Sequence, residues 1–163
     1  MAPLGKIIKI VIADGQTLVR EGLESLFQSE KSVEVIGTVE NGREAVDRAL
    51  ILDPDVIVMD MLMPVLDGYE ATGRLKSGEE TRHIPVIAVT ASAMKGSERK
   101  IGSLCDGYLA KPLSKMELIP LLTHFLHHFR GEAEEAPASR PIHPELASFV
   151  EKSLVPRWQR VNE

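Results

Sequence analysis

The chain has 163 residues, of which 44% are hydrophobic and 26% are charged, so one globular domain with a short appendage is expected. A formal net charge of -5 argues against sequence-general binding to nucleic acid, which requires a basic surface. No apolar run approaches the roughly 18 residues of a membrane span, no signal peptide is recognisable, and the single cysteine, Cys105, fits a reducing compartment. We therefore expect a cytoplasmic protein without nucleic-acid or membrane contacts.

Short apolar runs alternate with amphipathic segments along the first 130 residues. The expected strands are residues 7–13, 33–39, 55–59, 85–89 and 108–110. The expected helices are residues 18–27, 45–50, 67–75, 94–104 and 114–129. This alternation predicts an α/β fold with a doubly wound, five-stranded parallel sheet and helices on both faces. Pro120 lies past the first turn of the last helix, where proline costs about 3 kcal/mol, so we expect a kink or a helix that effectively starts later.

The composition changes after this region. Residues 131–142 are small, acidic and proline-containing, which is typical of a linker. Apolar residues return at helical spacing over residues 143–163, a segment too short to be an independent domain. We therefore expect a domain over residues 1–130, a linker and a helical tail. The apolar face of the tail, with Phe149 and Trp158, should pack on the domain or on a second copy.

One polar group stands at the end of four of the predicted strands. Asp14, Asp60 and Thr90 follow the first, third and fourth strands, and Lys111 follows the fifth. Because the carboxyl ends of parallel strands meet at one edge of a sheet, these groups should share a crevice. Taken singly, they are ordinary turn, strand and surface residues. Together, two carboxylates, a hydroxyl and an ammonium predict a site for Mg²⁺ and a phosphoryl group.

Three ordered motifs carry a resemblance to a known family. Residues 55–75, DVIVMDMLMPVLDGYEATGRL, contain D-x-x-M-P-x-x-D-G; residues 85–94, PVIAVTASAM, place a small residue after Thr90; and residues 106–114, DGYLAKPLS, contain an aromatic residue and a Lys-Pro pair. Over about residues 6–129 the chain resembles a response-regulator receiver domain of two-component signalling. The resemblance implies a (βα)5 flavodoxin-like fold with strand order 2-1-3-4-5.

The resemblance also implies roles for individual residues. Asp60 would be the phosphoacceptor, which takes a phosphoryl group from the phosphohistidine of a histidine kinase or phosphotransfer protein. Lys111 would pair with Asp60 or with a phosphoryl oxygen. Thr90 and Tyr108 would form a switch that changes the surface of the fourth helix, fifth strand and fifth helix, a candidate dimer interface. The chain would not be a metabolic enzyme and would catalyse at most its own phosphotransfer and dephosphorylation.

A metal site follows from the same resemblance. Asp14, Asp60 and the backbone carbonyl of Leu62 would bind Mg²⁺. The structural residues implied by the motifs are Pro64, Gly68 and Pro112, the last preceded by a cis peptide bond.

One position departs from the family's pattern. The family carries two adjacent acids after the first strand, whereas here Asp14 is followed by Gly15. We align Asp14 with the first acid and Gly15 with the second, which binds the cation directly; the alternative shifts this by one residue. Either alignment leaves two carboxylates, so Mg²⁺ binding should weaken, and repulsion that raises the pKa of Asp60 should diminish. The domain is then a working receiver, which we favour, or a degenerate receiver that acts as an unphosphorylated docking module.

Other candidate sites are weaker. His124, His127 and His128 have a spacing that could bind zinc, but their apolar neighbours and their place near a helix end favour a structural role. Cys105 has no base beside it in sequence and is expected to be a packing residue. A haloacid-dehalogenase-like phosphatase would need an aspartate at Leu62, and a flavodoxin-like nucleotide binder would need a phosphate-binding loop after the first strand.

The tail carries a resemblance of its own. Its sequence ELASFVEKSLVPRWQRVNE, residues 145–163, resembles the start of a helical extension that follows receivers in some hybrid histidine kinases. This suggests either a fragment of a longer chain or a single-domain receiver with a tail.

Overall fold

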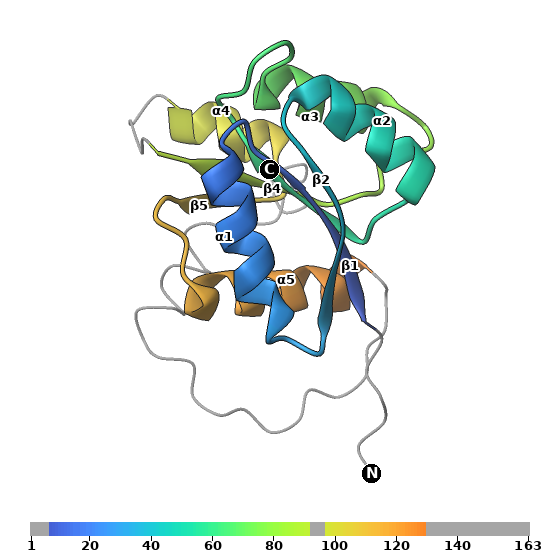
Figure 1. Ribbon diagram of the computed structural model, residues 1–163. Helices are drawn as coiled ribbons and strands as arrows, with labels where there is room; N and C mark the ends of the chain where they lie inside the picture. Colours follow the sequence, from blue (N-terminus) through green and yellow to red (C-terminus); the bar gives the residue numbers. More distant parts are fainter. Residues whose placement is uncertain (1–6, 92–96, 130–163) are drawn as a thin grey trace.

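The computed structural model describes residues 7–91 and 97–129; the expected linker and helical tail lie outside these residues. The described part of the chain forms one sheet between two layers of helices (Figure 1). Its elements are β1 (Ile8–Ala13), α1 (Thr17–Gln28), β2 (Val33–Val39), α2 (Gly42–Leu52), β3 (Val56–Asp60), α3 (Gly68–Ser77), β4 (Val86–Thr90), α4 (Ser97–Leu104), β5 (Gly107–Ala110) and α5 (Lys115–Phe129). The predicted alternation of five strands and five helices is confirmed.

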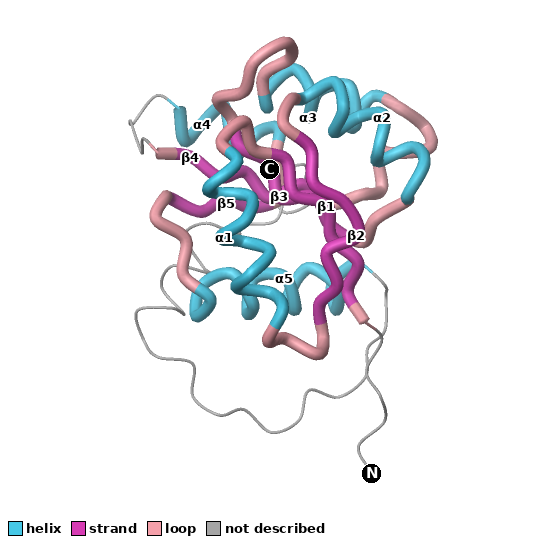
Figure 2. Tube along the Cα trace, in the orientation of Figure 1, coloured by secondary structure: helices cyan, strands magenta, loops and turns pink. Residues whose placement is uncertain are grey.

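All neighbouring strands are parallel, in the order β2-β1-β3-β4-β5, as predicted (Figure 2). The chain runs from β1 outward to β2 and then crosses to β3 on the other side of β1. The order of the strands therefore reverses between β1 and β3. In open α/β sheets this point forms a crevice outside the carboxyl ends of the strands. The continuous apolar runs of β3 and β4 are buried along their whole length, as central parallel strands require.

Helices α1 and α5 cover one face of the sheet (Figure 1). Leu23 and Phe27 of α1 are four residues apart and point to the same side, because an α-helix repeats every 3.6 residues. Leu118, Leu122 and Phe125 of α5 follow the same spacing and pack in the same cluster. Each fully buried side chain of this size contributes roughly 1.5–3 kcal/mol.

Helices α2, α3 and α4 cover the opposite face. Small residues, Ala45 and Ala49, let α2 approach the sheet closely, while Leu75 of α3 and Ile101 of α4 fill the space beside it. At the start of α2, the Gly42 amide donates to the Leu66 carbonyl at 2.9 Å, and a Cβ on Gly42 would collide with that carbonyl. Helix α2 therefore supports the loop between β3 and α3.

Several element bounds differ from the expected ones by a few residues, and two of these differences are informative. Strands β3 and β4 end one residue later than predicted, because their backbone pairing continues through Asp60 and Thr90 after the apolar run has stopped. Helix α5 begins at Lys115 and continues through Pro120, so a later start is wrong. The missing N–H of Pro120 would have bonded to the carbonyl of Met116, and both residues are exposed, so water can satisfy that carbonyl.

None of the helices in the described ranges combines the length and the apolarity that crossing a membrane requires.

Candidate functional site

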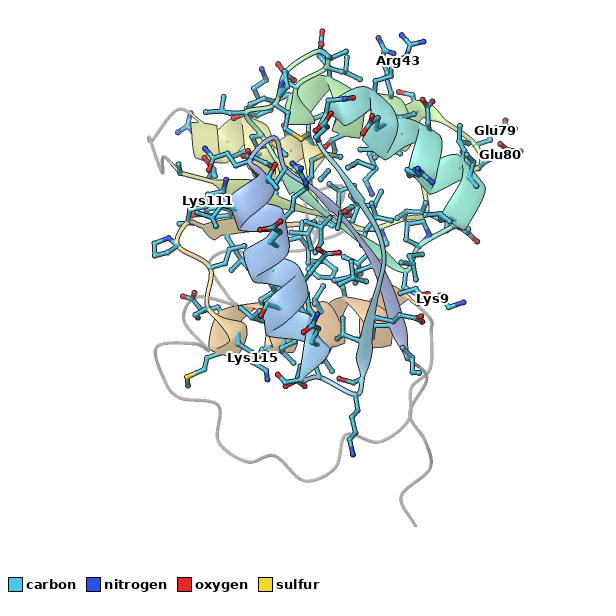
Figure 3. All side chains as sticks on the ribbon, in the orientation of Figure 1. Lys9, Arg43, Glu79, Glu80, Lys111 and Lys115 are labelled. Carbon is cyan, nitrogen blue, oxygen red and sulfur yellow. The ribbon has the colours of Figure 1, made fainter. Side chains whose placement is uncertain are left out.

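Two buried carboxylates and one ammonium meet at the carboxyl ends of β1 and β3. Asp60 is the last residue of β3 and is 6% exposed; Asp14 directly follows β1 and is 2% exposed. The Nζ atom of Lys111 lies 2.9 Å from Oδ2 of Asp14 and 3.5 Å from Oδ2 of Asp60. Figure 3 labels Lys111 at the end of β5, beside the start of α1. Lys111 was expected to pair with Asp60, and it also binds Asp14, at a shorter distance.

The environment of Asp60 changes the acidity of its carboxyl group. Burial is the main cause that raises its pKa, and the negative charge of Asp14 adds to it; Lys111 and the N–H of Leu62 act in the opposite direction. That N–H donates to Oδ1 of Asp60 at 3.3 Å. The loss of the acid at position 15 was expected to lessen the rise in pKa. Burial does not depend on that acid, so the pKa of Asp60 is raised without it.

Both carboxylate oxygens and the backbone carbonyl of Asp14 accept hydrogen bonds. Its Oδ1 accepts the N–H of Gln16 at 2.8 Å, and its backbone carbonyl accepts Nη1 of Arg20 at 2.6 Å. Arg20 also donates from Nη2 to the hydroxyl of Thr17 at 3.0 Å. Sequence reasoning did not single out Arg20. Its spacing of three residues from Thr17 on α1 could have predicted the contact with the Thr17 hydroxyl, but not the contact with the carbonyl of Asp14.

Thr90 and Tyr108 lie on the next two strands. Asp60 is paired with Val89, so Thr90 extends one residue further toward the same edge of the sheet. Thr90 is buried, and its carbonyl accepts the N–H of Lys111 at 2.8 Å. Tyr108 is half-buried and packs against the core on the α2–α3–α4 side. The structure thus brings Asp14, Asp60, Thr90 and Lys111 to one edge of the sheet. Tyr108 lies on β5, two residues before the last residue of that strand, Ala110.

The loop between β3 and α3 closes one side of the site. The N–H of Leu66 donates to the carbonyl of Pro64 at 2.7 Å across Val65, whose φ of 66° makes this a γ-turn. A Cβ on Gly68 would collide with the backbone of Asp60, so only glycine allows α3 to start this close to the site.

The resemblance also implied a cis peptide bond before Pro112, and the Lys111–Pro112 bond is cis.

Gly15 directly follows Asp14 and lies next to the β3–α3 loop. A Cβ at this position would lie 3.2 Å from Cδ of Pro64 and 3.6 Å from the carbonyl oxygen of Glu40. A side chain there would therefore enter the space between the β3–α3 loop and the end of β2, and Pro64 would have to yield by a few tenths of an ångström. Among the side chains that the structure describes, no group of three His, Cys, Asp or Glu residues is placed to hold a metal ion.

The donor set fits a Mg²⁺ ion. Mg²⁺ prefers oxygen ligands and usually keeps several waters beside one or two carboxylates, and Asp14 and Asp60 supply two. Both carboxylates already contact Lys111. A cation must therefore compete with an ammonium group for the same oxygens.

The other candidate residues do not form a second site in the described region. His124 packs edge-on against the ring of Phe125, with centroids 5.9 Å apart, while the side chains of His127 and His128 lie outside the described ones. Burial raises the pKa of Cys105 to about 12, so its thiol stays protonated and is a poor nucleophile at neutral pH.

The fold and the cluster of Asp14, Asp60 and Lys111 at the strand ends define a receiver domain. The sequence matches the response regulator receiver domain family over residues 10–123, and the chain belongs to this family. Over 87 residues it is 47% identical to the polar-differentiation response regulator DivK of Brucella anthropi, a match that covers 53% of this chain and 71% of DivK. Receiver domains of this family act in phosphorylation-dependent two-component signalling, with histidine kinases or phosphotransfer proteins as partners.

Solved structures of receiver domains are also similar to this chain. The receiver domain of sensor histidine kinase PA1611 from Pseudomonas aeruginosa PAO1, with a magnesium ion coordinated in the active site cleft, is 31% identical, with a TM-score of 0.67 over 74% of this chain and 98% of that domain. The signal receiver domain of a modulated diguanylate cyclase from Desulfovibrio desulfuricans G20 is 28% identical, with a TM-score of 0.69 over 77% of this chain and 98% of that domain. Mg²⁺ binding is a general property of the family.

Proposed function

We propose that this receiver accepts a phosphoryl group on Asp60 from the phosphohistidine of a histidine kinase or phosphotransfer protein. The observation that carries the proposal is the pairing of a buried strand-end carboxylate, Asp60, with the ammonium of Lys111 at 3.5 Å. This is the arrangement that an acceptor of phosphoryl groups needs: a fixed nucleophile and a cation beside it.

In the proposed reaction, an Oδ atom of Asp60 attacks the phosphorus of the phosphohistidine. An O–P bond forms, the N–P bond breaks, and its electron pair goes to the imidazole nitrogen, which leaves an acyl phosphate on Asp60 and a free histidine. Lys111 neutralises charge on a phosphoryl oxygen, and the hydroxyl of Thr90 donates to another. Bound Mg²⁺ would add further neutralisation of phosphoryl oxygens.

Movement of Thr90 toward the phosphoryl group supplies the switch. Tyr108 stands on the neighbouring strand, half-buried against the α2–α3–α4 core, so a change at Thr90 opens or closes space for its ring. The consequence is a rearranged α4–β5–α5 surface. This surface, or the tail of residues 143–163, is our candidate for a homodimer contact in a cytoplasmic protein. Truncation after residue 130 with no change in solution mass would exclude the tail as the contact.

We further propose that Mg²⁺ binds here more weakly than it would with a third carboxylate. Gly15 supplies none, and the two acids that remain are both engaged by Lys111. Each charged ligand lost from such a site lowers its affinity.

Phosphorylation is tested by incubating the full chain with acetyl phosphate over a range of Mg²⁺ concentrations and measuring the intact mass. We expect a single phosphoryl adduct that disappears in Asp60→Asn. Asp47→Asn, which removes an exposed carboxylate from α2, is the matched control and should label like the wild type.

An unphosphorylated docking module is the second candidate. It is favoured by the absence of an acid at Gly15. It is also favoured by the ion pairs of Lys111 with Asp14 and Asp60, which neutralise part of the negative charge of the two acids. If the folded wild-type chain shows no adduct at any Mg²⁺ concentration, this second function replaces the first.

A further inference from the structure

A second cation, Arg20, lies against the backbone of Asp14, and the family pattern assigns it no role. The guanidinium of Arg20 donates to the carbonyl of Asp14 at 2.6 Å and to the hydroxyl of Thr17 at 3.0 Å. Its Nη2 also lies 3.9 Å from a carboxylate oxygen of Glu40, and its side chain is 14% exposed. Three contacts and this degree of burial fix the positive charge at the end of β1.

The position of this charge matters because of what is missing beside it. Gly15 and Arg20 both border the end of β2: a Cβ on Gly15 would lie 3.6 Å from the carbonyl of Glu40, whose carboxylate faces Arg20. With Gly15 in place, Asp14 has Lys111 at its carboxylate and Arg20 at its backbone carbonyl, and the charge of Arg20 is partly offset by the exposed carboxylate of Glu40. An acid in place of Gly15 would add negative charge beside Asp14, which a bound cation would neutralise.

We propose that Arg20 is a positioning residue that takes over, as a fixed charge, part of the neutralisation that a divalent cation supplies in this family. It opposes Mg²⁺ binding at Asp14 and Asp60, and it makes phosphorylation of Asp60 less dependent on Mg²⁺. The second effect rests on the proposed function of Asp60, whereas the first does not.

The proposal predicts two opposite changes when the charge is removed. In Arg20→Gln, which keeps a donor for the carbonyl of Asp14, Mg²⁺ should bind more tightly, on the order of fivefold, because a nearby positive charge has gone. The same variant should be phosphorylated on the order of tenfold more slowly at low Mg²⁺ and should recover at saturating Mg²⁺. A purely structural role would weaken both properties together.

The first experiment is a calorimetric titration of the full chain with Mg²⁺ alone, without a phosphodonor. Arg20→Lys, which retains the charge, should bind Mg²⁺ like the wild type. Arg43→Gln is the matched control, because Arg43 is exposed and points outward from α2 (Figure 3). Equal or weaker Mg²⁺ binding by Arg20→Gln overturns the proposal. If Arg20→Gln fails to fold by circular dichroism, Arg20→Met, whose unbranched side chain fills the same half-buried space, is judged by the same criterion.

The second experiment measures the rate of labelling by acetyl phosphate as a function of Mg²⁺. A wild-type chain that labels, with an Arg20→Gln chain of unchanged Mg²⁺ dependence, overturns the inference and leaves the function of Asp60 intact. A wild-type chain that never labels overturns the proposed function and the phosphorylation part of this inference, while the calorimetric comparison still decides whether Arg20 opposes the cation.

Discussion

The Nζ atom of Lys111 lies 2.9 Å from Asp14 and 3.5 Å from Asp60, so the lysine that follows β5 binds the acid that follows β1 more closely than the phosphoacceptor candidate at the end of β3. Both carboxylates are almost fully buried, whereas the lysine side chain is 18% exposed. This ammonium contacts both carboxylates and therefore reduces the repulsion between their negative charges. This arrangement couples the stability of the domain to the chemistry of its site.

Removal of that ammonium should destabilise the domain. In Lys111→Met, Asp14 and Asp60 face each other without a cation, and we expect a loss of about 1–3 kcal/mol in the free energy of unfolding at pH 7, reduced from the fully buried case because the lysine is partly solvated. Urea unfolding measures this loss. Lys9→Met, at an exposed site on β1, is the control, and an equal loss in both variants would contradict the prediction.

The raised pKa of Asp60 predicts how stability depends on pH. Between the ordinary aspartate value of about 3.9 and the raised value, the folded state holds a proton that the unfolded state has lost, so stability falls as the pH rises through this window. Ionised Asp60 thus costs stability at pH 7. Asp60→Asn should raise the melting temperature at pH 7 by a few degrees.

The pH dependence of this rise in melting temperature distinguishes its cause. If burial of a charge is responsible, the advantage of Asp60→Asn should shrink as the pH is lowered, and should be smallest below the ordinary aspartate pKa, where the wild-type carboxyl group is protonated in both states. Thermal unfolding at several pH values measures it. A gain that stays constant with pH would mean that the asparagine stabilises the site by other contacts.

The order of the elements and the meeting of Asp14, Asp60, Thr90 and Lys111 were predictable, because apolar runs report buried strands and parallel strands end at one edge. The ends of β3 and β4 were not predictable to the residue. Backbone hydrogen bonds continue through the polar residues Asp60 and Thr90, which hydrophobicity cannot show.

Arg20 escaped prediction for a different reason. Its closest partner is a backbone carbonyl, that of Asp14, and every residue has one, so no side-chain pattern marks the contact. The dominant effect of burial on the pKa of Asp60 likewise depends on how closely the loops cover it, and sequence does not give that packing. Lys111 lies closer to Asp14 than to Asp60 by less than an ångström, and the sequence does not determine so small a difference in distance.

The γ-turn at Val65 stores backbone strain. Val65 has a φ of 66° and is 79% exposed, so a β-branched side chain occupies the left-handed region without burial to compensate. Val65→Asn, with a residue that tolerates this region, should stabilise the domain by about 0.5–1 kcal/mol in urea unfolding. Leu62→Asn, at another exposed apolar position of the same loop, should leave stability almost unchanged. A similar gain in both variants would attribute the effect to lower surface hydrophobicity.

Gly15 offers the sharpest test of the metal site. Gly15→Asp adds a carboxylate at the position that we align with the missing acid, and Mg²⁺ affinity should rise on the order of tenfold because the charge of the ligand set increases. The new Cβ would lie 3.2 Å from Cδ of Pro64, so a small loss of stability should accompany this gain. Gly15→Asn has the same shape without the charge and isolates the steric part. Calorimetric titration with Mg²⁺ compares the two variants: tighter binding in Gly15→Asp alone supports the alignment, whereas equal affinities would show that Asp14 already occupies the place of the direct ligand.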